Sequence, residues 1–115
     1  MKRSSDVAIT GLGVVSPHGD EPRQMFAALM RGESAIRPVF PELAKPAVAA
    51  VAAFDASRWF TKLQLAGVDR VSQLAVAAAD LAVKDAGGHE GIDPSRLGVY
   101  VGCGMGGTAS LDAAY

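Results

Sequence analysis

Cysteine and aromatic residues are scarce in this sequence of 115 residues, which has a single cysteine and 6% Phe, Trp and Tyr. One cysteine excludes an internal disulfide, and His18 and His89 are too far apart to form a zinc-ligand pattern. We therefore expect no metal centre. A lone thiol also fits a reducing compartment, so the expected location is the cytoplasm.

The sequence also lacks runs of like charge and long apolar stretches. The formal net charge is -1 and no Lys/Arg run is present, which argues against nucleic acids and anionic membranes as partners. The apolar segment AVAAVAAF, residues 47–54, is far shorter than the roughly 20 residues that cross a bilayer. The start, MKRSSDVAITGLGVV, resembles a signal peptide, but Asp6 and Thr10 interrupt its apolar part and no cleavage site follows. We expect mature sequence and no membrane partner.

Half of the residues are hydrophobic and 20% are charged, a balance typical of one compact domain. Two apolar segments that precede glycines, residues 7–10 and 97–101, predict buried strands. Residues 33–60 are rich in proline and alanine, which predicts a surface excursion with one short strand near residues 48–54.

Apolar spacing predicts two helices between these strands. The first covers residues 23–30 and ends before Gly32, and the second covers residues 69–86 and ends at the glycine pair 87–88. Polar side chains occupy only a narrow stripe of the second helix, so we expect it to be buried on nearly every side. A turn at residues 93–96 leads to the second strand, and a further helix begins after the last glycines.

This order of strand, helices, strand, glycine-rich turn and helix predicts an α/β fold with a parallel sheet. Two strands are too few for a parallel sheet that must be covered on both faces, and the chain ends on SLDAAY without a capping signal. We therefore expect residues 1–115 to be the N-terminal portion of a larger protein.

The glycine-rich segment near the end contains G-x-G-x-x-G at Gly102, Gly104 and Gly107, between a predicted strand and a predicted helix. This is the context of a dinucleotide-binding fingerprint. The acidic residue that would support it lies about 20 positions further on, beyond Tyr115, and the fingerprint usually follows the first strand of its domain. Glycines that permit a tight turn against close-packed backbone are the favoured interpretation, and a nucleotide-binding α/β domain is an alternative.

Cys103 is a candidate nucleophile because a helix N-terminus lowers a thiol pKa. Nothing in the sequence brings His18 or His89 to it as a base, and both histidines lie in turns expected to be exposed. A small buried apolar residue is the favoured interpretation of Cys103. Helix-start charge explains Asp69 and an i,i+4 pair explains Asp80 with Lys84, so neither requires catalysis.

Three segments together resemble a known family. VAITGLGVVSPHGDEPRQMFAALMRGESAIRPV, then VDRVSQLAVAAADLAVKDAG, then LGVYVGCGMGG are similar to the successive N-terminal signatures of β-ketoacyl-acyl carrier protein synthases, the condensing enzymes of the thiolase superfamily. The resemblance implies a thiolase-like layered α/β fold, of which this chain would hold the first strands and helices.

The resemblance also implies an activity. The full-length protein would be an acyltransferase that joins an acyl thioester to malonyl-acyl carrier protein in fatty acid or type II polyketide synthesis. It would act as a homodimer with acyl carrier protein as its partner and without a cofactor. A non-catalytic synthase homologue that sets chain length as a dimer partner is an alternative.

The family's catalytic cysteine and histidines lie downstream of this chain, so the resemblance implies no catalytic residue here and no activity for this chain alone. Cys103 matches a family position that is usually Ser or Thr and is not the nucleophile. Met105 matches the position of an apolar side chain that borders the acyl pocket near the dimer interface. Together with Gly104 and Gly106, it is the predicted substrate-binding segment.

Overall fold

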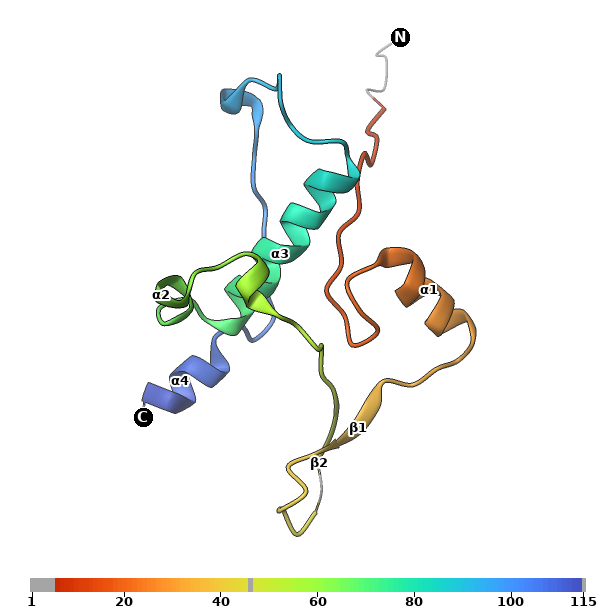
Figure 1. Cartoon of the computed structure of the whole chain (residues 1–115), viewed down its shortest axis with the longest axis vertical. Helices are drawn as coiled ribbons and strands as arrows, with labels where there is room; N and C mark the ends of the chain where they lie inside the picture. Colours follow the sequence, from red (N-terminus) through yellow and green to blue (C-terminus); the bar gives the residue numbers. More distant parts are fainter. Residues whose placement is uncertain (1–5, 46, 115) are drawn as a thin grey trace.

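Helices and one small hairpin make up the regular structure of the computed structural model, which describes residues 6–45 and 47–114. The α-helices, in chain order, are α1 (Pro22–Met30), α2 (Lys62–Leu65), α3 (Arg70–Asp85) and α4 (Thr108–Ala114). The strands are β1 (Ile36–Val39) and β2 (Ala47–Ala50), and two short 3-10 turns are η1 (Ala56–Arg58) and η2 (Pro94–Arg96). The molecule is elongated, at 63 × 39 × 29 Å, with the long helix α3 at its centre (Figure 1).

The helix ends follow local capping chemistry. Asp69 begins α3 because its side chain accepts a hydrogen bond from the backbone N–H of Ser72 at 2.9 Å. Gly87, with a φ of 85°, ends it in a backbone conformation that L-residues rarely adopt. Gly32, with a φ of 68°, follows α1 in the same way. The two predicted helices, residues 23–30 and 69–86, are therefore confirmed to within one residue at each end.

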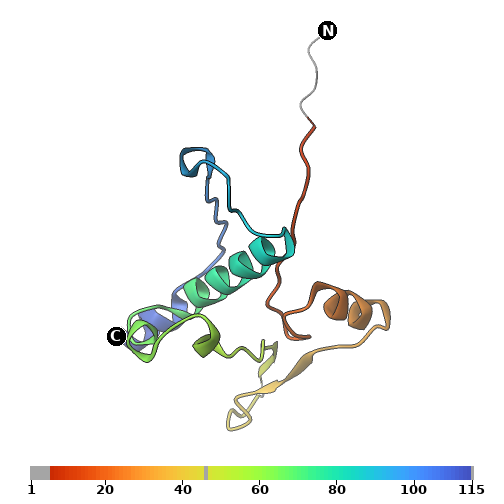
Figure 2. The same ribbon diagram turned by 45° about the horizontal axis from the view of Figure 1, so that its top comes forward.

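Residues 11–13 lie directly on the backbone of α3. A Cβ at Gly13 would overlap the carbonyl oxygen of Ala78 and lie 2.5 Å from the backbone nitrogen of Ala82. The backbone N–H of Leu12 donates to the Asp85 carboxylate at 2.9 Å. Figure 2 shows the N-terminal segment reaching α3 before the chain turns toward α1. Glycine on one side and alanine on the other permit this close approach.

The hairpin projects from the rest of the molecule (Figure 1). Its strands are antiparallel, with Ile36 opposite Ala50 and Val39 opposite Ala47. The short strand predicted near residues 48–54 overlaps β2, although β2 begins at Ala47 and ends at Ala50, earlier than predicted at both ends. The sequence reasoning missed β1 because Pro38 lies within it, and proline is tolerated in a strand whose outer edge is unpaired.

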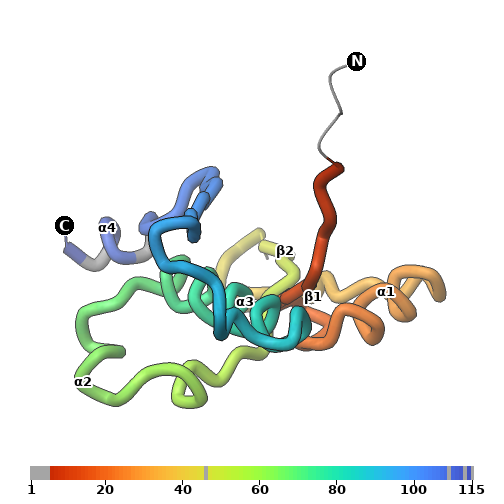
Figure 3. The backbone as a smooth tube through the Cα atoms, turned by 90° about the horizontal axis from the view of Figure 1, so that it is seen from above, coloured from red at the N-terminus to blue at the C-terminus, as the bar shows by residue number. Residues whose placement is uncertain are grey.

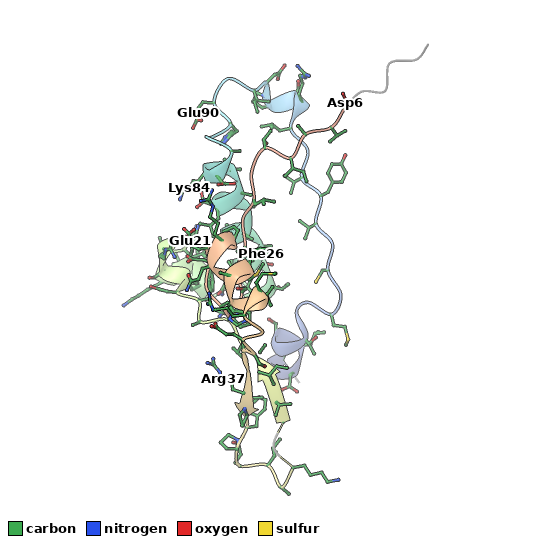
Figure 4. All side chains as sticks on the ribbon, turned by 90° about the vertical axis from the view of Figure 1, so that its right-hand side faces the viewer. Asp6, Glu21, Phe26, Arg37, Lys84 and Glu90 are labelled. Carbon is green, nitrogen blue, oxygen red and sulfur yellow. The ribbon has the colours of Figure 1, made fainter. Side chains whose placement is uncertain are left out.

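Residues 7–10 and 97–101 are extended but form no strand, so the prediction of two buried strands in a parallel sheet is wrong for the described residues. Val7 is 93% exposed and Tyr100 is 97% exposed. A strand requires a neighbour to pair its backbone N–H and C=O groups, and neither segment has one within residues 6–45 and 47–114. Figure 4 shows the chain between η2 and α4 running separately along one side of the molecule.

The buried apolar residues among those described are Ala28 on α1 and Ala77 on α3. The expectation that α3 is buried on nearly every side is wrong, since Val76 and Val83 keep 47% and 38% of their surface exposed. An apolar helix face is buried only where another element covers it, and in the described structure residues 11–13 cover one side of α3.

Candidate functional site

The glycine corner, residues 102–107, joins the extended segment to α4. Gly107 has a φ of 82°, which turns the chain into the helix. The Thr108 hydroxyl donates to the carbonyl oxygen of Met105 at 2.6 Å and closes the turn. The predicted helix after the glycines is therefore confirmed as α4.

One glycine of the corner is required by packing. A Cβ at Gly106 would overlap the sulfur of Cys103 and lie 2.8 Å from a methyl carbon of Val71 on α3. Gly102 and Gly104, in contrast, have open space where a Cβ would be. The corner thus approaches α3 at Gly106 and leaves the rest of its backbone accessible.

Met105 projects from this accessible backbone and is 85% exposed. Gly104 and Gly106 are exposed beside it, so the predicted substrate-binding residues form one continuous surface at the corner. A substrate could contact that surface without displacing any described side chain. Contact between Met105 and an acyl chain stays a prediction.

Cys103 is exposed, so the interpretation of a small buried residue is wrong for the described structure. Among residues 6–45 and 47–114, no strand pairs with the extended segment before it, and the thiol stays uncovered. His18 is half-buried rather than exposed, because the turn from Ser16 to Gly19 folds back with paired backbone hydrogen bonds beside α1. His89 is exposed, as expected.

Metal binding finds no support in residues 6–45 and 47–114. No group of three or more His, Cys, Asp or Glu side chains in this part of the chain could hold an ion. The acidic residues act locally instead: Asp55 and Asp93 each accept a hydrogen bond from a backbone N–H two residues later, which begins η1 and η2. Hydrogen bonding from the Ser57 side chain and then from its backbone N–H lowers the pKa of Asp55, and hydrogen bonding from the Ser95 backbone N–H and then from its side chain lowers the pKa of Asp93.

A half-buried cluster joins the segment before α2 to the middle of α3. The indole N–H of Trp59 donates to Asp80 at 2.8 Å, and the Lys84 ammonium pairs with the same carboxylate at 2.7 Å. Hydrogen bonds from Lys84 and then Trp59 lower the pKa of Asp80. The predicted i,i+4 pair of Asp80 and Lys84 is confirmed.

Two further contacts extend this cluster. The Arg58 guanidinium lies 4.5 Å from the centroid of the Trp59 ring and forms an ion pair with Asp20, which lowers the pKa of Asp20. Phe54 stacks on Trp59 with ring centroids 5.5 Å apart. Sequence reasoning missed this cluster, although Trp59 is the only tryptophan of the chain. It directly follows Arg58 and lies five positions after Phe54.

Two surface pockets lie near these features. One, of about 370 Å³, lies between residues 66–69 and Ser110 on α4, next to the glycine corner. The other, of about 350 Å³, has a mainly apolar lining that includes His18, Met25, Leu29 and Ile36. Neither contains Met105.

Comparison with known proteins decides the family. The model of the β-ketoacyl synthase N-terminal domain family matches residues 4–115. The chain belongs to this family. The resemblance seen in the three sequence segments is therefore confirmed, and the glycine corner is part of a synthase domain rather than of a nucleotide-binding domain.

The relatives include synthases named for polyketides and a 3-oxoacyl-[acyl-carrier-protein] synthase. The oxytetracycline polyketide putative β-ketoacyl synthase 1 of Streptomyces rimosus is 38% identical over 113 residues, and the granaticin polyketide putative β-ketoacyl synthase 1 of Streptomyces violaceoruber is 35% identical over 114. The 3-oxoacyl-[acyl-carrier-protein] synthase 2 of Rhizobium meliloti is 33% identical over 123. Each alignment covers 95% of this chain, but only 27%, 27% and 29% of the respective relative.

No helix within the described part of this synthase-family chain has both the length and the apolar character that crossing a membrane requires.

Proposed function

We propose that this chain is the N-terminal part of a β-ketoacyl-acyl carrier protein synthase with a thiolase-like layered fold. The full-length enzyme transfers an acyl group from its carrier-protein thioester to a cysteine outside this chain, and the carrier thiol leaves. Decarboxylation of malonyl-acyl carrier protein then releases CO2 and supplies the electron pair for the new carbon–carbon bond. The acyl carbonyl carbon forms that bond as its bond to the cysteine sulfur breaks, and the thiolate leaves. The enzyme acts as a cytoplasmic homodimer, and acyl carrier protein delivers both substrates.

The observation that carries this proposal is the family match over residues 4–115. The exposure of large apolar side chains supports it, because contiguous apolar surface marks sites that another surface covers. Val99 and Val101 in the extended segment before the glycine corner are 89% and 71% exposed. In the proposed enzyme, further strands pair with this segment and with residues 7–10.

Met105 contacts the acyl chain in this proposal. It lies between two glycines, so its side chain and the neighbouring backbone are both accessible to a substrate. Methionine is unbranched and fits irregular apolar surfaces, a property suited to acyl chains of different lengths. Gly104 lets the acyl chain pass close to the protein backbone, and Gly106 lets the corner pack against α3.

Condensation by the full-length protein tests the proposal. We expect purified full-length protein to form a covalent acyl-enzyme, detected by intact mass, and to release CO2 from malonyl-acyl carrier protein when an acyl primer is present. The chain of 115 residues alone serves as the control and is expected to do neither. A folded full-length protein that takes up no acyl group, yet changes the product length of a catalytic partner, would replace this proposal with the non-catalytic homologue.

A further inference from the structure

The short helix α2 has few connections to the rest of the molecule. Its hydrogen bonds are local: the Thr61 hydroxyl accepts from the Gln64 backbone N–H at 3.3 Å, and the Leu65 N–H donates to the Thr61 carbonyl at 3.0 Å. Leu63 is 86% exposed, and nothing lies within 4 Å of where a Cβ at Gly67 would be. Figure 3 shows α2 at the outer edge of the molecule.

The two ends of this region, in contrast, are attached to α3. Upstream, Trp59 donates its indole N–H to Asp80, a residue 21 positions later in the chain. Downstream, the Gln73 amide donates to the carbonyl oxygen of Val68 at 2.7 Å, and Asp69 caps α3. Between the described residues, no hydrogen bond or ion pair joins residues 62–67 to another element.

We infer that Trp59 and Asp80 form a latch that positions α2, and that residues 60–67 form a flap whose upstream end is held to α3 by this latch, beside the ion pair of Arg58 with Asp20. The downstream end of the flap lines the pocket of about 370 Å³ beside Ser110 on α4. Opening the latch therefore frees one wall of that pocket while α3 keeps its own cap. The inference concerns local conformation and does not depend on the proposed condensation activity.

Asp80 has two partners, Trp59 and Lys84, and their contributions can be separated by substitution. Asp80 accepts from both Trp59 and Lys84, but only the bond to Trp59 reaches outside α3. Replacing Lys84 removes an i,i+4 ion pair on an exposed helix face, which contributes little. Alanine at position 80 lacks the carboxylate and so removes the acceptor of the latch. Asparagine at the same position keeps a side-chain oxygen that can accept from the indole N–H.

Amide hydrogen exchange of the full-length protein, read by mass spectrometry, tests the latch. In Asp80→Ala and Trp59→Phe we expect peptides covering residues 60–68 to exchange about 3–10 times faster, the change that follows from losing one ordinary hydrogen bond. In Asp80→Asn and Lys84→Ala, exchange in these peptides should stay close to that of the parent. Peptides from α1 serve as the internal reference and should be unchanged in all four variants.

Three results would overturn the inference. If residues 60–68 exchange at the parental rate in both Asp80→Ala and Trp59→Phe, other contacts hold α2. If α1 and residues 60–68 accelerate equally, Trp59 and Asp80 support the whole fold rather than the flap. Faster exchange in Lys84→Ala equal to that in Asp80→Ala would assign the effect to the ion pair and also exclude the latch.

Discussion

Two glycine-rich segments of this molecule look alike in sequence and differ in their surroundings. At residues 11–13, a Cβ on either glycine would overlap a carbonyl oxygen of α3, and one on Gly11 would also lie 2.7 Å from the backbone nitrogen of Ala86. At the glycine corner, Gly102 and Gly104 face open space. The first segment needs glycine for packing, whereas most of the second keeps its backbone accessible.

The difference shows that the role of a glycine motif depends on the residues that pack beside it. The corner matches a dinucleotide fingerprint by spacing, yet it belongs to a synthase domain and displays Met105. The earlier segment matches no such fingerprint, yet its glycines have the closest backbone neighbours. Gly106 is the one position at which the corner resembles the earlier segment, because Val71 and Cys103 fill the space beside it.

The largest expected effect comes from adding a methyl group to the packed segment. Gly13→Ala should lower the free energy of unfolding of the full-length protein by about 1–3 kcal/mol or more, because the new Cβ meets rigid helix backbone rather than a movable side chain. Denaturant unfolding of parent and variant measures the change.

Gly102→Ala is the matched control, since a Cβ there meets nothing within 4 Å. We expect its free energy of unfolding to stay within about 0.5 kcal/mol of the parent. Equal losses of unfolding free energy in Gly13→Ala and Gly102→Ala would contradict this difference. They would mean that the corner is packed as tightly as residues 11–13.

Local signals made much of the fold predictable. Asp69 and Gly87 mark the ends of α3 through capping, which depends only on residues within one turn, and Gly32 does the same for the end of α1. The position of the glycine corner and the helix that follows it were predictable for the same reason. Met105, Gly104 and Gly106 lie together because they are consecutive.

Long-range contacts could not be predicted from the sequence. Residues 7–10 and 97–101 have strand composition, but pairing depends on a neighbour that composition does not reveal. The bond between Trp59 and Asp80 spans 21 positions and leaves no periodic pattern. Burial of Cys103 and His18 was predicted incorrectly in both cases, because exposure depends on which segments fold over a residue.

At the accessible glycine corner, we expect a substitution to change substrate specificity rather than stability. Met105→Phe should spare short acyl primers and disfavour long ones, because phenylalanine cannot move aside as methionine does. Each blocked methylene corresponds to up to about 0.8 kcal/mol, or roughly fourfold in kcat/KM. The ratio of kcat/KM for a long and a short primer measures the effect.

Met105→Leu controls for the loss of the thioether, since leucine has a similar volume and should leave the ratio nearly unchanged. An unchanged ratio in a stably folded Met105→Phe protein would remove Met105 from the predicted substrate-binding residues.

Acidification should weaken the interactions of Asp80 on α3, the helix against which residues 11–13 pack. The Asp80 pKa is lowered by Lys84 and then by Trp59, so the folded protein holds this proton less tightly than the unfolded chain does. Its contribution is therefore fully present above the unfolded pKa of about 3.9 and is lost as the pH falls through the lower folded value. The difference in unfolding free energy between parent and Asp80→Asn should shrink as the pH falls below about 4. A difference that stays constant down to pH 3 would contradict the lowered pKa.

The smallest effect is expected for Cys103→Ser. The thiol is exposed at the corner, and the sulfur lies where Gly106 leaves room for it, so a smaller hydroxyl fits the same space. We expect kcat/KM for condensation to stay within about 2–3-fold of the parent, the range of an ordinary surface substitution. Serine is a poor replacement for a nucleophilic thiolate without a matched base, so a catalytic Cys103 would lose its acyl-enzyme altogether. Intact mass of the folded variant after incubation with an acyl primer distinguishes the two cases, because the proposed nucleophile lies outside this chain and should still take up the acyl group.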